Sequence, residues 1–166
     1  MAGILLPSEA LPATLESDYQ VKAAYLYHFA RFVEWPAEAA GAPLTISVIG
    51  KAPASFAAAL AGISGKTVRN RRLVINFVDR VEDLQGCDIL FVTGVEKGRV
   101  EHILASVASR PILTVSDLSR FVATGGMIGF VPGNDKVRFA INQRVSQRSG
   151  LRISAQLLKL ATTVVE

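Results

Sequence analysis

The sequence has few residues that form cross-links or bind metals. Its 166 residues include one cysteine, Cys87, and two histidines, His28 and His102. A single cysteine excludes an intrachain disulfide, a CxxC pair and a zinc site built from several thiolates. The histidines lie far apart in the sequence, and neither has a neighbour at metal-ligand spacing. We therefore expect no metal and no other cofactor.

Long hydrophobic runs and a concentrated charge are also missing. Half of the residues are apolar, which is enough for one sizeable core. The most apolar stretch, residues 23–35, is interrupted by His28, Arg31 and Glu34, well short of the ~18 apolar residues of a spanning helix. The formal charge is +4, but the basic residues are scattered rather than interleaved with aromatics as in nucleic-acid-binding proteins. We expect a soluble or peripheral protein with no nucleic-acid partner.

The first residues do not form a complete secretory signal. The apolar segment 3–7 has no basic region before it and is too short for a hydrophobic signal core. Residues 1–16 contain two prolines and small polar residues, which predicts a flexible leader followed by one domain over 17–166. Two interpretations stay open: a cytoplasmic protein, or a mature chain whose signal has been removed.

Apolar periodicity predicts an α/β domain. Ser17 and Gln20 have capping-box spacing, and Trp35-Pro36 stops a helix, so we expect a helix over 17–34. Short β-branched runs predict strands at 44–49, 73–78, 88–93 and 112–115, and helices are expected at 56–60, 93–109 and 116–122. This alternation predicts a compact sandwich with a mainly parallel central sheet and helices on both faces.

The last third of the chain has a different pattern. Residues 127–131 and 136–141, joined by the turn Pro132–Asp135, predict an antiparallel hairpin, and a final helix is expected to carry Ile153, Leu157 and Val164. A terminal hairpin can present an unpaired edge, and exposed apolar groups there would mark a protein contact. The alternative is that these side chains cover the sheet's own core. The residues expected to contact a partner are Met127, Phe130, Phe139, Leu151 and Ile153.

Catalytic motifs are not found. There is no nucleophile elbow and no complete phosphate-binding loop. Residues 62–67 resemble the end of such a loop, but Leu60 stands where its first glycine is required. Cys87 begins an apolar strand, a position typical of a small buried residue. No acid–base pair can be assembled, so we expect a protein that is not an enzyme.

Polar residues on the last hairpin strand and directly after it suggest an anion site. Arg138, Asn142, Arg144 and Arg148 lie close in sequence, the last two at helical spacing. Guanidinium groups bind carboxylate or phosphate through paired hydrogen bonds. The alternative is a solvated basic face.

The order of several motifs resembles the YfiR-like periplasmic family over about residues 18–165. The matching segments are VKAAYLYHFARFVEWP at 21–36, CDILFV at 87–92, ILTVSD at 112–117, GGMI at 125–128, VRFAIN at 137–142 and ISAQLLKLA at 153–161. The chain departs from the family in having only Cys87, whereas well-known members carry further cysteines that form disulfides. An intrachain redox switch is therefore excluded.

The resemblance implies a compact α/β fold and a regulator rather than an enzyme. YfiR-like proteins act in the periplasm of Gram-negative bacteria. They bind the periplasmic domain of an inner-membrane diguanylate cyclase and repress cyclic di-GMP synthesis, which affects biofilm formation. The resemblance also implies a homodimer and an outer-membrane lipoprotein that sequesters the repressor. The alternative function is a sensor that binds an anionic metabolite or nucleotide through the arginine group.

Overall fold

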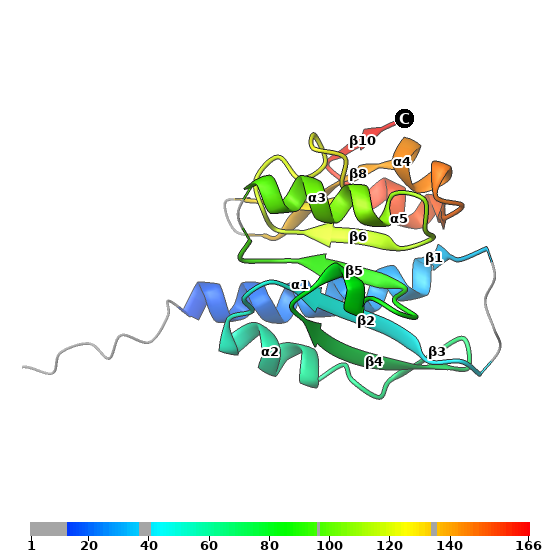
Figure 1. The fold of residues 1–166 in the computed structure, drawn as a ribbon. Coiled ribbons are helices and arrows are strands. Elements are labelled where there is room, and N and C mark those ends of the chain that lie inside the picture. The colour runs from blue at the N-terminus through cyan, green and yellow to red at the C-terminus, as the bar shows by residue number, and fades with distance from the viewer. Residues whose placement is uncertain (1–12, 37–40, 96, 134–135) are drawn as a thin grey trace, which may run out of the picture.

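An eight-stranded sheet forms the centre of the computed structural model, which describes residues 13–36, 41–95, 97–133 and 136–166 (Figure 1). Its strand order is β10-β8-β7-β6-β5-β2-β4-β3. The strands are β2 (Leu44–Ile49), β3 (Thr67–Val68), β4 (Arg71–Val78), β5 (Ile89–Val92), β6 (Leu113–Ser116), β7 (Ile128–Val131), β8 (Arg138–Asn142) and β10 (Thr163–Val165).

The central strands are parallel, as the alternation of strands and helices predicted. β4, β2, β5, β6 and β7 form consecutive parallel pairs, and β7 and β8 form the predicted antiparallel hairpin. The strands predicted at 44–49, 73–78, 88–93 and 112–115 correspond to β2, β4, β5 and β6. The mainly parallel sheet with an antiparallel hairpin is therefore confirmed.

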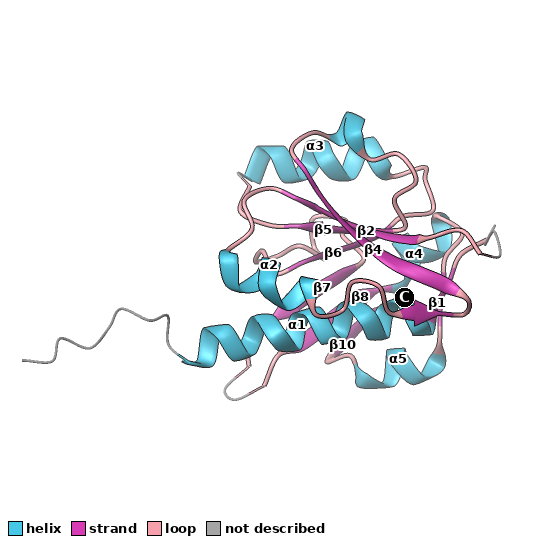
Figure 2. Cartoon of the chain, turned by 90° about the horizontal axis from the view of Figure 1, so that it is seen from below, coloured by secondary structure: helices cyan, strands magenta, loops and turns pink. Residues whose placement is uncertain are grey.

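Helices cover both faces of this sheet (Figure 2). On one face lie α1 (Ala13–Phe32), α2 (Ala54–Ala61) and α5 (Ala155–Leu160), and on the other lies α3 (Lys97–Val107). Successive residues of β5 alternate between two cores: Ile89 and Phe91 pack toward α1, whereas Leu90 and Val92 pack toward α3. A strand that is buried on both faces needs apolar residues at nearly every position, which explains its continuous apolar sequence.

The first helix differs from its prediction at both ends. α1 begins at Ala13, so the predicted capping box at 17–20 lies inside the helix, and residues 1–12 of the expected leader lie outside the described residues. The helix ends at Phe32 because Val33–Glu34 form the short strand β1, which pairs with β9 (Arg152–Ile153). This antiparallel pair forms a separate two-stranded sheet. No local pattern predicts this pair, because its two strands are more than a hundred residues apart in the chain.

The β3–β4 hairpin stabilises the end of α1. Arg69 and Asn70 both have positive φ values, +47° and +63°, as a two-residue type I′ turn requires. This turn directs the Arg69 guanidinium to the carbonyl oxygens of Arg31 at 2.7 Å and Val33 at 2.8 Å. A cation at a helix C-terminus satisfies carbonyls that have no partner within the helix.

The helix predicted over 116–122 is wrong, because this segment forms turns. The Ser116 hydroxyl accepts a hydrogen bond from the backbone N–H of Leu118 at 3.0 Å, and such a side-chain acceptor competes with helical bonding. Arg120 has a φ of +63°, in the left-handed region that a right-handed helix excludes.

The single terminal helix is also wrong. Instead, the chain forms α4 (Gln143–Arg148), β9, α5 and β10. Gly150 interrupts the helical path with a φ of +83°, and the Ser154 hydroxyl caps α5 by accepting from Leu157 N at 3.2 Å. β10 then pairs in parallel with β8. The hairpin is therefore not the edge of the sheet.

Candidate functional site

The five apolar residues expected to contact a partner are core residues. Met127, Phe130, Phe139, Leu151 and Ile153 are each at most 9% exposed. Phe130 and Phe139 are paired across the hairpin, and the Phe29 ring of α1 lies 6.0 Å and 5.3 Å from their respective centroids. The expectation that these side chains form an exposed surface is wrong, because all five belong to the core and α1 packs over the two phenylalanines. The core alternative, which the sequence left open, is the observed one.

The structure separates the arginine group. Arg138 and Asn142 occupy opposite ends of β8, about 13 Å apart at the rise of a strand. The Asn142 side chain caps α4 by accepting from Val145 N at 3.2 Å, and Arg144 donates to the carbonyl oxygen of Glu166 at 2.6 Å. Arg148 is exposed one helical turn after Arg144. The four residues do not converge on one anion, although the pair on α4 shares a helix face.

The usual ligand position of an open α/β sheet is closed in this protein. Such sheets bind ligands at the carboxyl ends of the strands where the strand order reverses, here between β2 and β5. Gly50 follows β2 with a φ of +103°, and a Cβ placed on it would lie 1.6 Å from the carbonyl oxygen of Thr93. Only glycine permits this close approach of the loops that follow β2 and β5.

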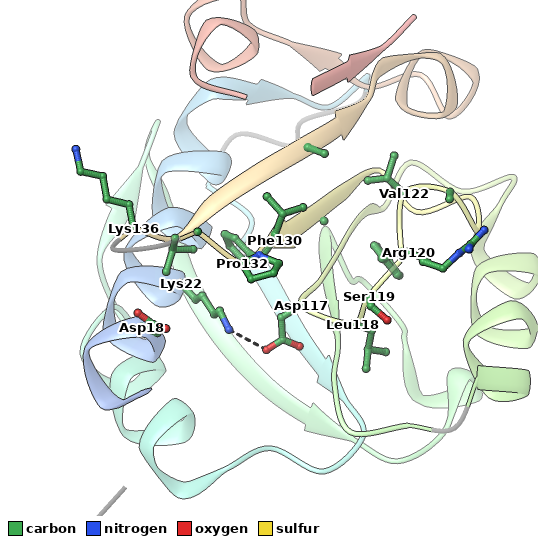
Figure 3. Close-up of a pocket in the computed structure, with 17 residues that line it drawn as sticks. Asp18, Lys22, Asp117, Leu118, Ser119, Arg120, Val122, Phe130, Pro132 and Lys136 are labelled. Carbon is green, nitrogen blue, oxygen red and sulfur yellow. Dashed lines mark hydrogen bonds and ion pairs between the residues drawn. The ribbon is translucent and has the colours of Figure 1, made fainter. Parts of the chain in front are cut away.

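A cavity of about 940 Å³ lies further along the same edge of the sheet (Figure 3). Its walls come from the first part of α1, the turns after β6 and the strands of the hairpin. The volume lies within the range of small-molecule sites, about 300–1,000 Å³. The apolar lining includes Leu118, Val122, Phe130, Pro132 and Val137.

An ion pair joins two walls of this cavity. Lys22 Nζ lies 3.1 Å from Asp117 Oδ2, and the side chains are 16% and 18% exposed. The same ammonium lies 5.0 Å from the centroid of the Tyr19 ring. Burial, together with the negative charge of Asp117, raises the pKa of the Tyr19 hydroxyl above its ordinary value. The cavity therefore has a partly desolvated charged centre.

Sequence reasoning missed this centre. The helix predicted over 116–122 would make Asp117 an acid of its first turn, and no sequence pattern singles out Lys22. The two residues are 95 positions apart, and no local pattern pairs a residue in the middle of a helix with one after a strand. The only usable signal was the position of Asp117 at the carboxyl end of a predicted strand.

A different part of α1 contributes to the outer surface. Val21 is 38% exposed and Leu160, in the last turn of α5, is 66% exposed. The His28 ring lies 6.5 Å from the Tyr25 ring and 6.3 Å from the Phe32 ring. We call Val21, Tyr25, His28, Phe32 and Leu160 the α1–α5 surface. Elsewhere, Phe77 on β4 is 54% exposed.

Cys87 is buried, and its thiol donates to the carbonyl oxygen of Ile89 at 3.2 Å. Burial raises the pKa of this thiol to about 11, so it stays protonated near neutral pH. The interpretation of Cys87 as a small core residue is confirmed. In the described ranges, no three His, Cys, Asp or Glu side chains are grouped as metal ligands. None of the described helices has both the length and the hydropathy of a membrane span.

Comparisons with known proteins give a family and a fold. A family model described as YfiR/HmsC-like matches residues 19–162. Among solved structures, the chain resembles an ABC domain from Streptococcus pneumoniae in complex with L-Trp, with a TM-score of 0.57, 13% identity and 89% of this chain covered. It also resembles a conserved domain protein from Vibrio cholerae, with a TM-score of 0.53, 12% identity and 88% covered. The chain spans 60% of each of these structures, so at this identity they show a shared fold alone.

Proposed function

Because this chain belongs to the YfiR/HmsC-like family of periplasmic regulators of cyclic di-GMP signalling, we propose that it binds the periplasmic domain of a membrane diguanylate cyclase and represses it. The observation that carries this proposal is the family match over residues 19–162. It extends from the first helix to the residue before β10.

Repression by such a protein is a binding equilibrium. A regulator shifts a two-state enzyme only through its different affinities for the two states. A repressor that binds the inactive state about a hundredfold more tightly than the active one shifts the equilibrium by about 2.7 kcal/mol. The required feature is therefore a surface that fits one conformation of the cyclase domain.

We place this contact on the α1–α5 surface. Val21, Tyr25, His28 and Phe32 are spaced three or four residues apart, so they lie along one side of α1. α5 lies beside this helix (Figure 2), and its first turn is attached through the hydrogen bond from Ser154 N to the Phe32 carbonyl oxygen at 2.9 Å. Val21 and His28 on α1 and Leu160 on α5 are exposed, whereas Tyr25 and Phe32 are half-buried beside them. Exposed apolar side chains on packed helices are typical of protein contacts.

Two further partners belong to this proposal. An outer-membrane lipoprotein would sequester the regulator and release the cyclase, and the regulator would form a homodimer. Both interactions are testable with the purified chain, the first by competition against the cyclase domain and the second by light scattering over a range of concentrations.

The test is a binding measurement with the purified periplasmic domain of the cyclase. We expect Leu160→Glu to weaken binding by about tenfold or more, because it places a charge in an apolar contact. Phe77→Glu is the matched control, since Phe77 is comparably exposed but lies on β4. Both variants should unfold at the same temperature as the wild type, because neither side chain is buried.

The outcomes test the proposed function and the proposed contact surface separately. If the wild-type chain does not bind the cyclase domain and its deletion leaves cellular cyclic di-GMP unchanged, the proposed function is wrong. If Phe77→Glu abolishes binding while Leu160→Glu does not, the function stands and the contact lies at the β4 edge instead.

A further inference from the structure

We propose that two copies of this chain pair through the open edge of β4, so that their sheets join across a twofold axis at Asn76. The pairing rests on the homodimer of the proposed function and gives that homodimer a surface. It uses residues outside the α1–α5 surface, so the cyclase contact is a separate matter.

β4 is the last long strand at one end of the sheet (Figure 1). β3 follows it in the strand order but pairs only with Arg71 and Arg72, at the start of β4. Among the described residues, no strand pairs with the rest of β4 on this side. The other end of the sheet is β10, which has only three residues. A short edge strand discourages pairing between sheets, whereas residues 73–78 form an edge long enough for it.

The backbone of β4 shows which groups face this edge. Leu73 N donates to the carbonyl oxygen of Lys66 at 2.8 Å, and the carbonyl oxygen of Leu73 accepts from Gly65 N at 2.9 Å. The peptide groups of Leu73 therefore face away from β2, and because the direction alternates along a strand, those of Ile75 and Phe77 face the same way. Within the described ranges, neither residue has a hydrogen-bond partner on this side. The N–H and C=O groups of both residues are open to a second strand.

The side chains along this edge do not protect it. Residues 73–78 have the sequence LVINFV, without a charge or a proline. Edge strands of proteins that stay monomeric commonly carry lysine or proline, because open backbone groups beside apolar side chains pair readily with another strand. Phe77 is 54% exposed, and Ile75 is half-buried.

One register of two antiparallel copies uses all of the open groups. It pairs Ile75 with the partner's Phe77 and Phe77 with the partner's Ile75, so that each pair exchanges two hydrogen bonds. A shift in one direction would require Leu73, whose groups are already bonded, and a shift in the other would pair Ile75 with Asp79, beyond the end of β4. Asn76 then faces the partner's Asn76 on the axis, as a self-complementary interface requires.

This register also covers the exposed apolar side chain. Leu73 and Ile75 belong to the core on the α1 side of the sheet, so Phe77 points to the same side. The partner's Ile75 would lie directly across from Phe77, and an aromatic residue opposite a β-branched one is a favourable cross-strand pair. On the other side, Val74 would lie opposite the partner's Val78.

The charges at the two ends of β4 favour an antiparallel second copy. Three exposed basic residues lie at or before its start, namely Lys66, Arg69 and Arg72. Three exposed carboxylates against two arginines lie near its end, namely Asp79, Glu82 and Asp83 against Arg80 and Arg99. Antiparallel pairing places the acidic end of one copy beside the basic start of the other, and this complementarity selects the second copy as the occupant of the edge.

Sedimentation velocity of the full chain tests the dimer. A contact of one strand is smaller than a standard interface, so we expect a dissociation constant of about 10–100 µM. Phe77→Glu should weaken the dimer by about tenfold or more, because it places a charge at the apolar edge. Leu160→Glu is the matched control and should dimerise like the wild type, since Leu160 lies on α5. Cyclase binding is measured at about 1 µM, where the chain is monomeric, so the two tests are independent.

Cysteine cross-linking tests the register, because the native Cys87 is buried. Two Asn76 residues on the axis form a pair without backbone bonds, with Cα atoms about 4.5 Å apart, which a disulfide can span. We expect Asn76→Cys to form a covalent dimer on mild oxidation. Arg72→Cys is the control: it is exposed on the same strand, but its counterpart would be about 26 Å away at the rise of a strand.

Three results would overturn the proposal. The first is a wild-type chain that stays monomeric up to about 500 µM, in which case the homodimer is wrong too, whereas the cyclase measurement still decides the proposed repression. If Phe77→Glu also lost cyclase binding, the edge would pair with the cyclase domain instead. The second is a Phe77→Glu variant that dimerises like the wild type, which would place the homodimer on another surface. The third is cross-linking of Arg72→Cys as readily as of Asn76→Cys.

Discussion

The ammonium of Lys22 lies 3.1 Å from the carboxylate of Asp117, and this contact joins the middle of the first helix to the turns after β6. Both side chains are more than four-fifths buried, so water weakens their attraction less than that of a surface pair. The pair therefore fixes the helix against the wall of the cavity.

The energy of this ion pair can be measured directly. We expect a double-mutant cycle with Lys22→Met and Asp117→Asn to give a coupling energy of about 1 kcal/mol, the upper part of the range for pairs with some exposure. Urea unfolding of the four proteins supplies the values. A coupling below about 0.3 kcal/mol would mean that the pair is not formed in solution.

The Arg69 contact with the end of α1 makes a second prediction. Arg69→Ala should lower the free energy of unfolding by about 1–2 kcal/mol, because the variant loses charge-assisted hydrogen bonds to a carbonyl of the last turn of α1 and to one in β1. Asn70→Gly is the control in the same turn. It should be neutral or slightly stabilising, since glycine adopts a φ of +63° without strain. Equal losses in both variants would indicate that the turn, rather than the cap, matters.

Burial of the hairpin predicts opposite results for two large apolar residues. Phe139 is 1% exposed and Leu160 is 66% exposed. Phe139→Ala should cost about 3–5 kcal/mol of stability, the range for truncating a core aromatic, whereas Leu160→Ala should change it by less than about 0.5 kcal/mol. If Phe139→Ala were as stable as the wild type, the hairpin would not be packed beneath α1.

Cys87 predicts a loss of stability at high pH. Burial raises the pKa of its thiol from 9.0 to about 11, so between these values the folded chain keeps a proton that the unfolded chain has released. Stability is therefore complete below pH 9 and falls as the pH rises toward 11, by up to about 1.4 kcal/mol per pH unit. Cys87→Ala should lose this part of the decline when the two proteins are compared by urea unfolding, whereas the part at higher pH that follows from the raised pKa of Tyr19 remains.

Thiol chemistry gives an independent measurement of the same burial. The native protein should react with a thiol reagent at pH 8 far more slowly than the urea-unfolded chain, because the thiolate is both rare and covered. Equal rates in both states would contradict the burial of Cys87.

The predictions of helices and strands are correct where a local sequence pattern decides the structure. The run Leu44–Ile49 is β-branched and ends at Gly50, and it forms β2 as expected. The segment after Ser116 failed, because a hydroxyl bond to Leu118 and the left-handed Arg120 outweigh its helical pattern. The terminal helix failed for another reason: the partners of β9 and β10 are distant strands, and long-range pairing overrides local propensity.

The sequence by itself determined the fold class, the family and the exclusion of disulfides, because apolar periodicity, motif order and a cysteine count are properties of the chain. Tertiary structure decided which apolar residues are exposed and which charges meet. The hairpin phenylalanines are buried because α1 packs over them. The single cysteine lies in the core between the sheet and α3. Lys22 and Asp117 meet because the fold places the end of β6 beside the first helix. The two residues are 95 positions apart, so no local sequence pattern predicts this contact.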